Sequence, residues 1–313
     1  MKRAFVFPGQ GSQAPGMGQA LAEAFAPARE LFDEVDDALS QHLSRLMFDG
    51  PESELMLTEN AQPALLAASL AVVRVLESGG GFDIRRHAAY VAGHSLGEYS
   101  ALAAARAMSI GDAARLVKRR GRAMQKAVPV GVGAMAALLG IDIEAAREIA
   151  DAASNGQVCA VANDNGPGQI VVSGHREAVE RAVALAAAQG ARRSIMLPVS
   201  APFHSPLMAP AAEIMAEALA ETRIESPLVP VVTNVTAAPS SDPAEIRELL
   251  VAQVTRMVRW RESVQLLAAE EIEEVVEVGA GRVLAGLVKR IDRTLPAISV
   301  GTPGEAEALI ERL

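Results

Sequence analysis

Residues 93–97 read Gly-His-Ser-Leu-Gly, a G-x-S-x-G pattern with Ser95 at its centre. The apolar run 87–92 before it predicts a strand, and the alanine-rich segment 98–108 after it predicts a helix. This order is the setting of a nucleophile elbow, in which the serine hydroxyl stands clear of the sheet. The sequence therefore predicts Ser95 as a nucleophile, with the backbone N–H of Leu96 facing a developing oxyanion. An ordinary glycine-flanked turn with a capping serine is the alternative.

A nucleophilic serine needs a general base, and the sequence offers five histidines. His204 lies in the segment 199–206, where the chain is expected to return from its middle part to the main fold. Such a junction favours a cleft. His204 is therefore the candidate base, and a solvated loop histidine is the alternative. The others are expected to be surface, packing or helix-capping residues: His42, His87, His94 and His175.

No carboxylate between the serine and the histidine stands out as the third member of a triad. The candidates mostly occupy helix starts or a turn: Asp112, Asp142, Asp151 and Asp164. A dyad is chemically sufficient when a carbonyl group fixes the tautomer and the ring orientation of the histidine. The sequence favours such a dyad.

Two further segments bear on the substrate. Residues 8–13 form a glycine-rich turn after the first apolar run, but they lack the Gly-Lys-Ser/Thr ending of a phosphate loop. This turn suits an oxyanion loop that carries Gln10. Arg120 precedes Gly121, which leaves room for backbone or ligand, and a fixed guanidinium grips a carboxylate through two parallel hydrogen bonds. A solvated helix face is the alternative for Arg120.

Strands and helices alternate along the chain, and they must position these residues. Short apolar runs predict strands at 4–7, 87–92, 229–234 and 275–278. Helices are expected between them, including one over residues 20–40 and one over residues 63–77 with Pro63 in its first turn. This alternation is typical of a parallel sheet that is covered on both faces.

The middle of the chain predicts a different order of strands and helices. Residues 128–198 predict the order β-α-β-β-α-β, which is that of a ferredoxin-like unit. We therefore expect an α/β fold with a discontinuous main domain, residues 1–127 and 199–313. The small ferredoxin-like domain, residues 128–198, is inserted in it.

Composition excludes several classes of protein. The formal net charge of −9 argues against nucleic acid or an anionic membrane surface as the main partner. The single cysteine, Cys159, excludes a disulfide framework and a multi-cysteine metal site. Apolar stretches such as residues 64–73 fall short of the ~20 residues that cross a bilayer, and the first apolar run is too short for a signal peptide. A cytoplasmic location is expected.

Several motifs occur in one order, and together they are far more specific than any one alone. They lie in residues 5–13, 61–64, 93–100, 120–125, 163–169, 203–208, 234–235, 253–260 and 277–279. Together these segments resemble the malonyl-CoA:acyl carrier protein transacylases of type II fatty acid synthesis, and the likeness spans nearly the whole chain.

The resemblance implies a discontinuous α/β-hydrolase-like domain with a ferredoxin-like insert. It also implies roles for single residues. Ser95 resembles the nucleophile that takes the malonyl group as an ester, and His204 resembles its base. Leu96 and Gln10 would supply the two oxyanion N–H donors. Gln253 would orient His204 by accepting its second ring N–H.

The resemblance extends to the acyl pocket. Arg120 would hold the free malonyl carboxylate, and Gln62, Asn163 and Phe203 would line the pocket. Phe203 before the histidine resembles the malonyl-selective form rather than the methylmalonyl one. The clearest departure from common members is Met257, where proline is frequent, and it leaves the loop after Gln253 less certain.

The reaction implied by the resemblance is a ping-pong acyl transfer. Malonyl-CoA acylates Ser95, coenzyme A leaves, and the phosphopantetheine thiol of acyl carrier protein attacks the ester, without a metal or a bound cofactor. A carrier protein is usually acidic, so docking is expected to use a local basic patch. Cations that could contribute are Arg115, Lys118, Arg119, Arg122, Lys289 and Arg290.

Three other functions are weighed against this one. A related malonyl transferase for polyketide synthesis or malonate decarboxylase would carry the same residues. A serine hydrolase or thioesterase would show a buried aspartate partner of His204. A binding module without catalysis has no need of Ser95, His204 and Arg120 together.

Overall fold

The apolar run after Lys2 becomes the central strand β1 (Arg3–Phe7) of the larger sheet. Phe5 and Phe7 pack into the core on one face, and Ala4 and Val6 pack into the core on the other. Alternate residues of a strand must point to opposite faces. Because helices cover both faces, the run is apolar without interruption.

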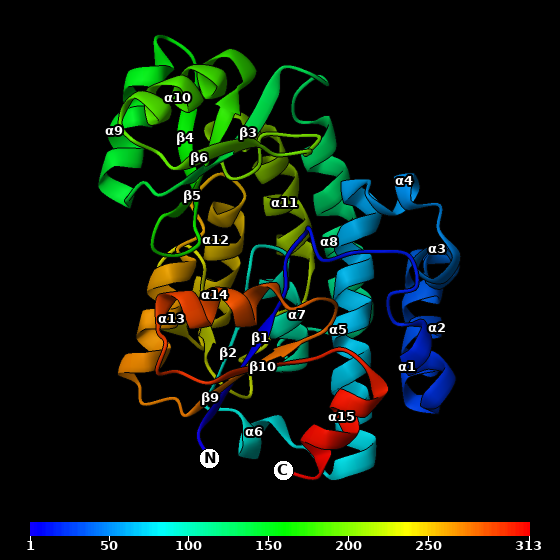
Figure 1. Cartoon of the computed structure of the whole chain (residues 1–313). Helices are drawn as coiled ribbons and strands as arrows, with labels where there is room; N and C mark the ends of the chain where they lie inside the picture. The colour runs from blue at the N-terminus through cyan, green and yellow to red at the C-terminus, as the bar shows by residue number, and fades with distance from the viewer.

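The computed structural model describes residues 1–79 and 81–313, and this part of the chain folds around two β-sheets (Figure 1). The larger sheet has the order β10-β9-β1-β2-β7-β8, in which each neighbouring pair is parallel except β7 with β8. The expected α/β class with a parallel sheet is thus confirmed. Its other strands are β2 (Tyr90–Gly93), β7 (Val231–Val232), β8 (Pro239–Ser240), β9 (Glu274–Val278) and β10 (Ala297–Val300).

Two groups of helices cover this sheet. The core on one face draws on α1 (Gln19–Ala24), α2 (Ala26–Leu39), α3 (Leu43–Asp49), α5 (Thr58–Gly80), α7 (Gly97–Ala104), α8 (Ile110–Lys126), α11 (Ala209–Glu221), α12 (Pro243–Gln253) and α15 (Pro303–Ile310). The other face packs on α13 (Trp260–Ala269) and α14 (Val283–Ile291). Short elements complete the chain: α4 (Glu52–Leu55), α6 (Ile84–His87) and the 3₁₀ turn η1 (Pro206–Met208).

Two helix expectations were wrong in detail. The segment 20–40 forms two helices, because Phe25 adopts an extended conformation with φ −130° and ψ 118°. Helix α5 begins at Thr58, so Pro63 lies inside it rather than in its first turn. Pro63 has no N–H to donate to the preceding turn, and packing in the core outweighs that missing bond.

Helix α5 is also longer than the expected segment. Its stretch Thr58–Gly79 is long and apolar enough to span a membrane by length and composition alone. However, 83% of the most apolar window is buried inside the protein, so that surface packs against protein. Figure 1 shows α5 between α2 and the sheet.

The second sheet comes from the middle of the chain. Its order is β4-β5-β3-β6, and its neighbours are antiparallel. The elements follow as β3 (Gly133–Leu139), α9 (Ile143–Ser154), β4 (Cys159–Asp164), β5 (Gln169–His175), α10 (Arg176–Ala188) and β6 (Arg193–Met196). In Figure 1 this sheet lies above the larger one, toward the ends at which β1 and β2 stop.

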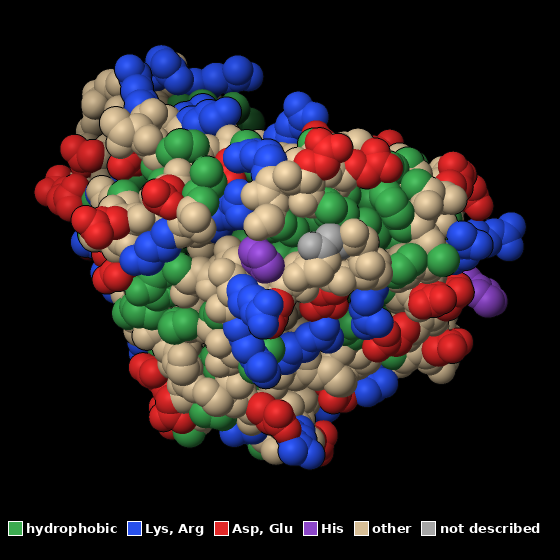
Figure 2. All heavy atoms as spheres, turned by 90° about the horizontal axis from the view of Figure 1, so that it is seen from below, with side chains coloured by type: hydrophobic (Ala, Val, Ile, Leu, Met, Phe, Trp, Pro, Cys, Tyr) green, Lys and Arg blue, Asp and Glu red, His purple; other side chains and the backbone are tan. Residues whose placement is uncertain are grey.

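Backbone hydrogen bonds connect the second sheet to the loop between α12 and α13. Val258 donates to the carbonyl oxygen of Ala162 and accepts from the backbone N–H of Asp164, each at 2.9 Å. The side chain of Asp164 pairs with Arg261 at 2.8 Å. The end of β4 is therefore fixed to the loop between α12 and α13. At the opposite end of the molecule, acidic and basic side chains are interspersed (Figure 2).

Candidate active site

Ser95 lies on a sharp turn between the end of β2 and the start of α7. Its φ of 53° is in the left-handed region, which non-glycine residues rarely adopt. The flanking glycines are required by close packing. A Cβ on Gly97 would lie 2.1 Å from the carbonyl oxygen of Phe7, and one on Gly93 would lie 1.9 Å from Gly97. The five residues of the pattern therefore fold as a strained elbow.

The hydroxyl of Ser95 faces His204. Ser95 Oγ lies 2.8 Å from His204 Nε2, and His204 Nδ1 lies 2.8 Å from the backbone carbonyl oxygen of Gln253. Because a carbonyl oxygen can only accept, Nδ1 carries the proton and Nε2 is free to accept one from Ser95. His204 is buried, and this burial, with the charge of Arg120 beside it, lowers its pKa to about 3. The imidazole is thus neutral at neutral pH, as a base must be.

The candidate acids lie elsewhere. Asp112 pairs with Arg115 and accepts from the hydroxyl of Ser109, the N-cap of α8, and Asp142 caps α9 through the backbone N–H of Ala145. Asp164 pairs with Arg261, and Asp151 is exposed. Within the described residues, none of the four is hydrogen-bonded to His204. The arrangement is a dyad oriented by a carbonyl group.

Arg120 is the cation closest to the nucleophile among the described residues. Its Nη2 donates to Ser95 Oγ at 3.1 Å and to Gln253 Oε1 at 2.8 Å, and its Nη1 donates to Gln62 Oε1 at 2.8 Å. The side chain is 1% exposed, and its Nε has no partner among the described residues. A buried arginine that still has a free N–H is suited to an anionic ligand.

The space beside Gly121 is filled by protein rather than by ligand. A Cβ at this position would lie 2.6 Å from the carbonyl oxygen of Thr58. Gly121 therefore lets α8 approach the start of α5, which brings Arg120 and Gln62 together.

The oxyanion candidates flank the serine. Gln10 follows β1 and Leu96 follows Ser95, and both line the cavity over the dyad. The side chain of Gln10 donates to Thr58 Oγ1 at 3.3 Å. In the described part of the chain, neither the Gln10 nor the Leu96 backbone N–H donates to a protein acceptor. Free N–H groups beside a nucleophile are what an oxyanion requires.

A cavity of about 290 Å³ opens above Ser95, between the two sheets. Gln62, Asn163 and Phe203 line it, as the sequence predicts, whereas Gln253 stands behind Arg120 and His204. Its apolar wall includes Met56, Met124, Met135, Val171 and Leu197. An apolar cavity with one cation and one nucleophile suits a short acyl group with a negative end.

Two further residues, Asn234 and Glu98, hold the elbow, and neither was among the predicted site residues. Asn234 Oδ1 accepts from the backbone N–H of Ser95 at 2.7 Å, and its Nδ2 donates to the carbonyl oxygen of Gly93. Glu98 is buried beneath the elbow, and burial raises its pKa to about 7. Both residues occur in the motifs noted above, and that was the one signal that could have found them.

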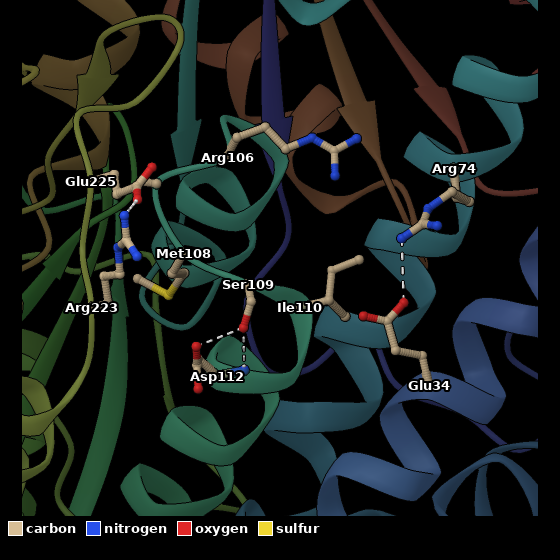
Figure 3. Close-up of a pocket in the computed structure, with 10 residues that line it drawn as sticks. Glu34, Arg74, Arg106, Met108, Ser109, Ile110, Asp112, Arg223 and Glu225 are labelled. Carbon is tan, nitrogen blue, oxygen red and sulfur yellow. Dashed lines mark hydrogen bonds and ion pairs between the residues drawn. The ribbon is translucent and has the colours of Figure 1, made fainter.

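Another cavity of about 420 Å³ lies over the start of α8, with Glu34 of α2 and Arg74 of α5 on one side and Arg223 and Glu225 on the other (Figure 3). Its charged side chains neutralise one another: Arg74 pairs with Glu34, and Arg223 pairs with Glu225. Its serine, Ser109, is the N-cap of α8 and bonds Asp112, and no histidine is among the described residues that line it. Among the described residues, no group of three or more histidine, cysteine, aspartate or glutamate side chains could hold a metal ion.

The cations expected on α8 for carrier docking are paired with acids of this chain. Arg115 pairs with Asp112, Arg122 with Glu59, and Arg119 with Glu217 and Glu221. Lys118 is buried and donates to Gln41 and Asn60, so it does not belong to a surface patch.

Comparison with known proteins gives one consistent result. Residues 4–302 match the family described as acyl transferase domain. The malonyl CoA-acyl carrier protein transacylase of Bacillus subtilis (strain 168) is 48% identical over 314 residues, covering 100% of this chain and 97% of that protein.

Solved structures agree. An acyl-carrier-protein S-malonyltransferase from Bartonella henselae superposes with a TM-score of 0.97 at 52% identity, covering 100% of this chain and 99% of that one. A malonyl-transacylase in complex with its type II PKS acyl-carrier protein has a TM-score of 0.96 at 43% identity, with 100% of each chain covered. This chain belongs to the malonyl CoA-acyl carrier protein transacylase family of acyltransferases.

Proposed function

We propose that this enzyme transfers a malonyl group from malonyl-CoA to the phosphopantetheine thiol of acyl carrier protein. The group is carried between the two thiols as an ester on Ser95. The observation that carries this proposal is the contact between Arg120 and Ser95, with Nη2 at 3.1 Å from Oγ. It places a buried cation beside the reacting oxygen, where a short acyl chain would end in a carboxylate.

In the first half-reaction, Ser95 Oγ attacks the thioester carbonyl carbon while His204 Nε2 takes its proton. The backbone N–H groups of Gln10 and Leu96 stabilise the oxyanion of the tetrahedral intermediate. When the C–S bond breaks, His204 returns its proton to the coenzyme A sulfur. The carbonyl oxygen of Gln253 holds the ring in place during both transfers.

The second half-reaction reverses these steps. His204 takes the proton of the carrier thiol, the sulfur attacks the ester carbonyl carbon, and Ser95 Oγ leaves with the proton from His204. These steps use side chains and backbone of this chain alone, and we propose that neither a metal nor a bound cofactor takes part.

Arg120 selects the acyl group in this scheme. Its Nε is free, and Nη2 can exchange its contact with Ser95 for a carboxylate oxygen. Charge-assisted bonds of this kind contribute roughly 1.5–3 kcal/mol each. An acetyl group offers no such partner and leaves the buried guanidinium without a counter-ion from the substrate.

We also propose how the chain is divided into two domains. We assign residues 1–127 and 199–313 to an α/β-hydrolase-like catalytic domain and residues 128–198 to a ferredoxin-like insert. The β-α-β-β-α-β order of the second sheet supports this division. A cytoplasmic location stays a prediction, supported by the single buried cysteine.

Carrier docking would use cations that form no ion pair within the chain. The paired arginines of α8 are poor candidates. Lys289 and Arg290 at the end of α14 are better ones, since neither forms an ion pair among the described residues, although Arg290 donates to the side chain of Gln169. A relative in this family is known with a type II PKS carrier, so a polyketide carrier is the second candidate acceptor.

Intact-protein mass spectrometry tests the function. Incubation with malonyl-CoA is expected to add one malonyl group, and addition of phosphopantetheinylated carrier protein is expected to remove it onto the carrier. Ser95→Ala is expected to abolish the adduct with its fold intact. An adduct on another residue would refute the assignment of Ser95, and release of free malonate without carrier would indicate a hydrolase.

A further inference from the structure

Glu98 is a buried acid that no step of the proposed reaction uses. Its side chain is 1% exposed, and it lies in the first turn of α7, below Ser95. A buried carboxylate is costly unless hydrogen bonds satisfy it. Its Oε2 accepts from Gln253 Nε2 at 2.8 Å and from the backbone N–H of Asn234 at 3.1 Å. Both donors belong to residues that contact the elbow.

The carboxamide of Gln253 stands between two groups of opposite hydrogen-bonding character. A carboxylate can only accept and a guanidinium can only donate. Gln253 therefore turns its NH₂ group toward Glu98 and its Oε1 toward Arg120, which donates to it at 2.8 Å. The same NH₂ group also donates to the backbone carbonyl oxygen of Ser95 at 2.9 Å. The reverse orientation would set the NH₂ group against the guanidinium and Oε1 against the carboxylate.

We propose that Glu98 is a positioning residue for acyl-group selection: it fixes the orientation of the Gln253 carboxamide, which holds the Arg120 guanidinium beside Ser95. This inference rests on the proposed function, because it concerns selection of the malonyl carboxylate. Glu98 does not touch the acyl group itself, and it acts on Arg120 only through Gln253.

An amide in place of the carboxylate removes one of the three groups that orient the Gln253 carboxamide; the Arg120 guanidinium and the carbonyl oxygen of Ser95 remain. The side chain of Glu98→Gln can accept from or donate to Gln253, so the reversed orientation is no longer opposed by a charged acceptor. In that orientation Arg120 Nη2 loses Gln253 Oε1, and only Gln62 Oε1 still holds the guanidinium beside the acyl pocket. A carboxylate-bearing substrate should suffer from this loss, whereas an acetyl group should not.

The matched control is Glu274→Gln. Glu274 is also a buried acid, and it pairs with Arg3 at 2.9 Å and with Arg312 at 2.6 Å. It lies at the start of β9, whereas the elbow follows the end of β2, so its loss of charge is remote from the acyl pocket.

The experiment measures kcat and KM for malonyl and acetyl thioesters at pH 8, where Glu98 is ionised in view of its raised pKa. In Glu98→Gln the malonyl-to-acetyl ratio of kcat/KM is expected to fall about tenfold, mainly through KM for the malonyl thioester. In Glu274→Gln this ratio is expected to stay at the wild-type value. Glu98→Asp, whose shorter side chain still only accepts, is expected to recover part of the ratio.

An unchanged or increased ratio in Glu98→Gln, or an equal loss with both thioesters, would overturn the inference. Should Glu98→Gln fail to fold, NMR of the wild-type Gln253 side chain decides. A rigid side-chain amide, with a high ¹⁵N order parameter, supports a fixed carboxamide, and an order parameter as low as that of an exposed glutamine refutes it. Failure of the wild-type enzyme to accept malonyl would instead refute the proposed function itself.

Discussion

The backbone carbonyl oxygen of Gln253 accepts a hydrogen bond from His204 Nδ1 at 2.8 Å, so this residue orients the base through its main chain. Its side chain is left to bond Arg120 and Glu98. Orientation of the base and placement of the carboxylate-binding cation therefore depend on different groups of one residue. Mutation of the side chain separates them.

Gln253→Ala should keep the carbonyl group that holds His204 and lose the acceptor of Arg120. Malonyl transfer is expected to fall about tenfold, the loss of one charge-assisted hydrogen bond. Labelling of Ser95 by an uncharged, serine-directed fluorophosphonate should stay within about twofold of wild type. Comparable losses in the two assays would show that the side chain also supports the base.

His204→Ala should lower transfer by ~10²–10⁴-fold, the usual contribution of a general acid–base. Burial beside the positive charge of Arg120 lowers the pKa of His204 from an ordinary 6.5 to about 3, so the neutral base persists in mild acid. The rate of Ser95 labelling by the uncharged fluorophosphonate, which makes no bond to Arg120 and so does not depend on the ionisation of Glu98, should therefore show no step near pH 6.5 between pH 8 and pH 5. Half-loss near pH 6.5 would indicate that an exposed histidine is the base.

Arg120→Ala should cut malonyl transfer by at least about tenfold, since 1.4 kcal/mol is one decade. Acetyl transfer should change far less, because the acetyl group makes no bond to the guanidinium. Arg122→Ala is the matched control, since Arg122 lies on the same helix but pairs with Glu59 at the surface. Equal losses with both thioesters would mean that Arg120 is structural.

Replacement of Glu98 should also change how the free energy of unfolding depends on pH. Burial raises its folded-state pKa to about 7 from an ordinary 4.5, so its protonated form stabilises the native state below pH 4.5. That stability is lost as pH rises through 7, at roughly 1.4 kcal/mol for each unit between the two pKa values. Relative to wild type, Glu98→Gln should thus gain stability from pH 5 to pH 8 in urea unfolding. A relative loss over this range would contradict the assigned pKa direction.

Gly97→Ala should destroy the elbow. Its Cβ would lie 2.1 Å from the carbonyl oxygen of Phe7, so β1 and α7 would have to separate. Loss of the malonyl adduct and a lower melting temperature are expected. Gly304→Ala, where a Cβ meets nothing within 4 Å, should be tolerated. An active Gly97→Ala enzyme would show that the turn can relax.

The elbow could be predicted from sequence because five adjacent residues and their flanks encode it. His204 could be chosen only by its place in the chain, since it lies 109 residues from Ser95. The dyad was predictable because the candidate acids sat at helix starts and in a turn. These are local signals, and the sequence carries them plainly.

Glu98 and Asn234 could not be predicted in the same way. An acid in the first turn of a helix ordinarily faces water and interacts with the helix dipole. The burial of Glu98 depends on Gln253, which is 155 residues away. The start of α5 was missed for a related reason: proline marks a helix start by local preference, and packing extended the helix backward to Thr58.

The hydrogen bonds of Val258 to Ala162 and Asp164 restrict movement of the second sheet relative to the active site. Val258 lies in the loop between Gln253 and α13. A rotation of the second sheet would therefore displace the segment that carries the carbonyl acceptor of His204. We therefore expect the width of the cleft above Ser95 to change little when a substrate binds. Hydrogen exchange at the amides of Asp164 and Val258 should accordingly be as slow with a substrate bound as without one.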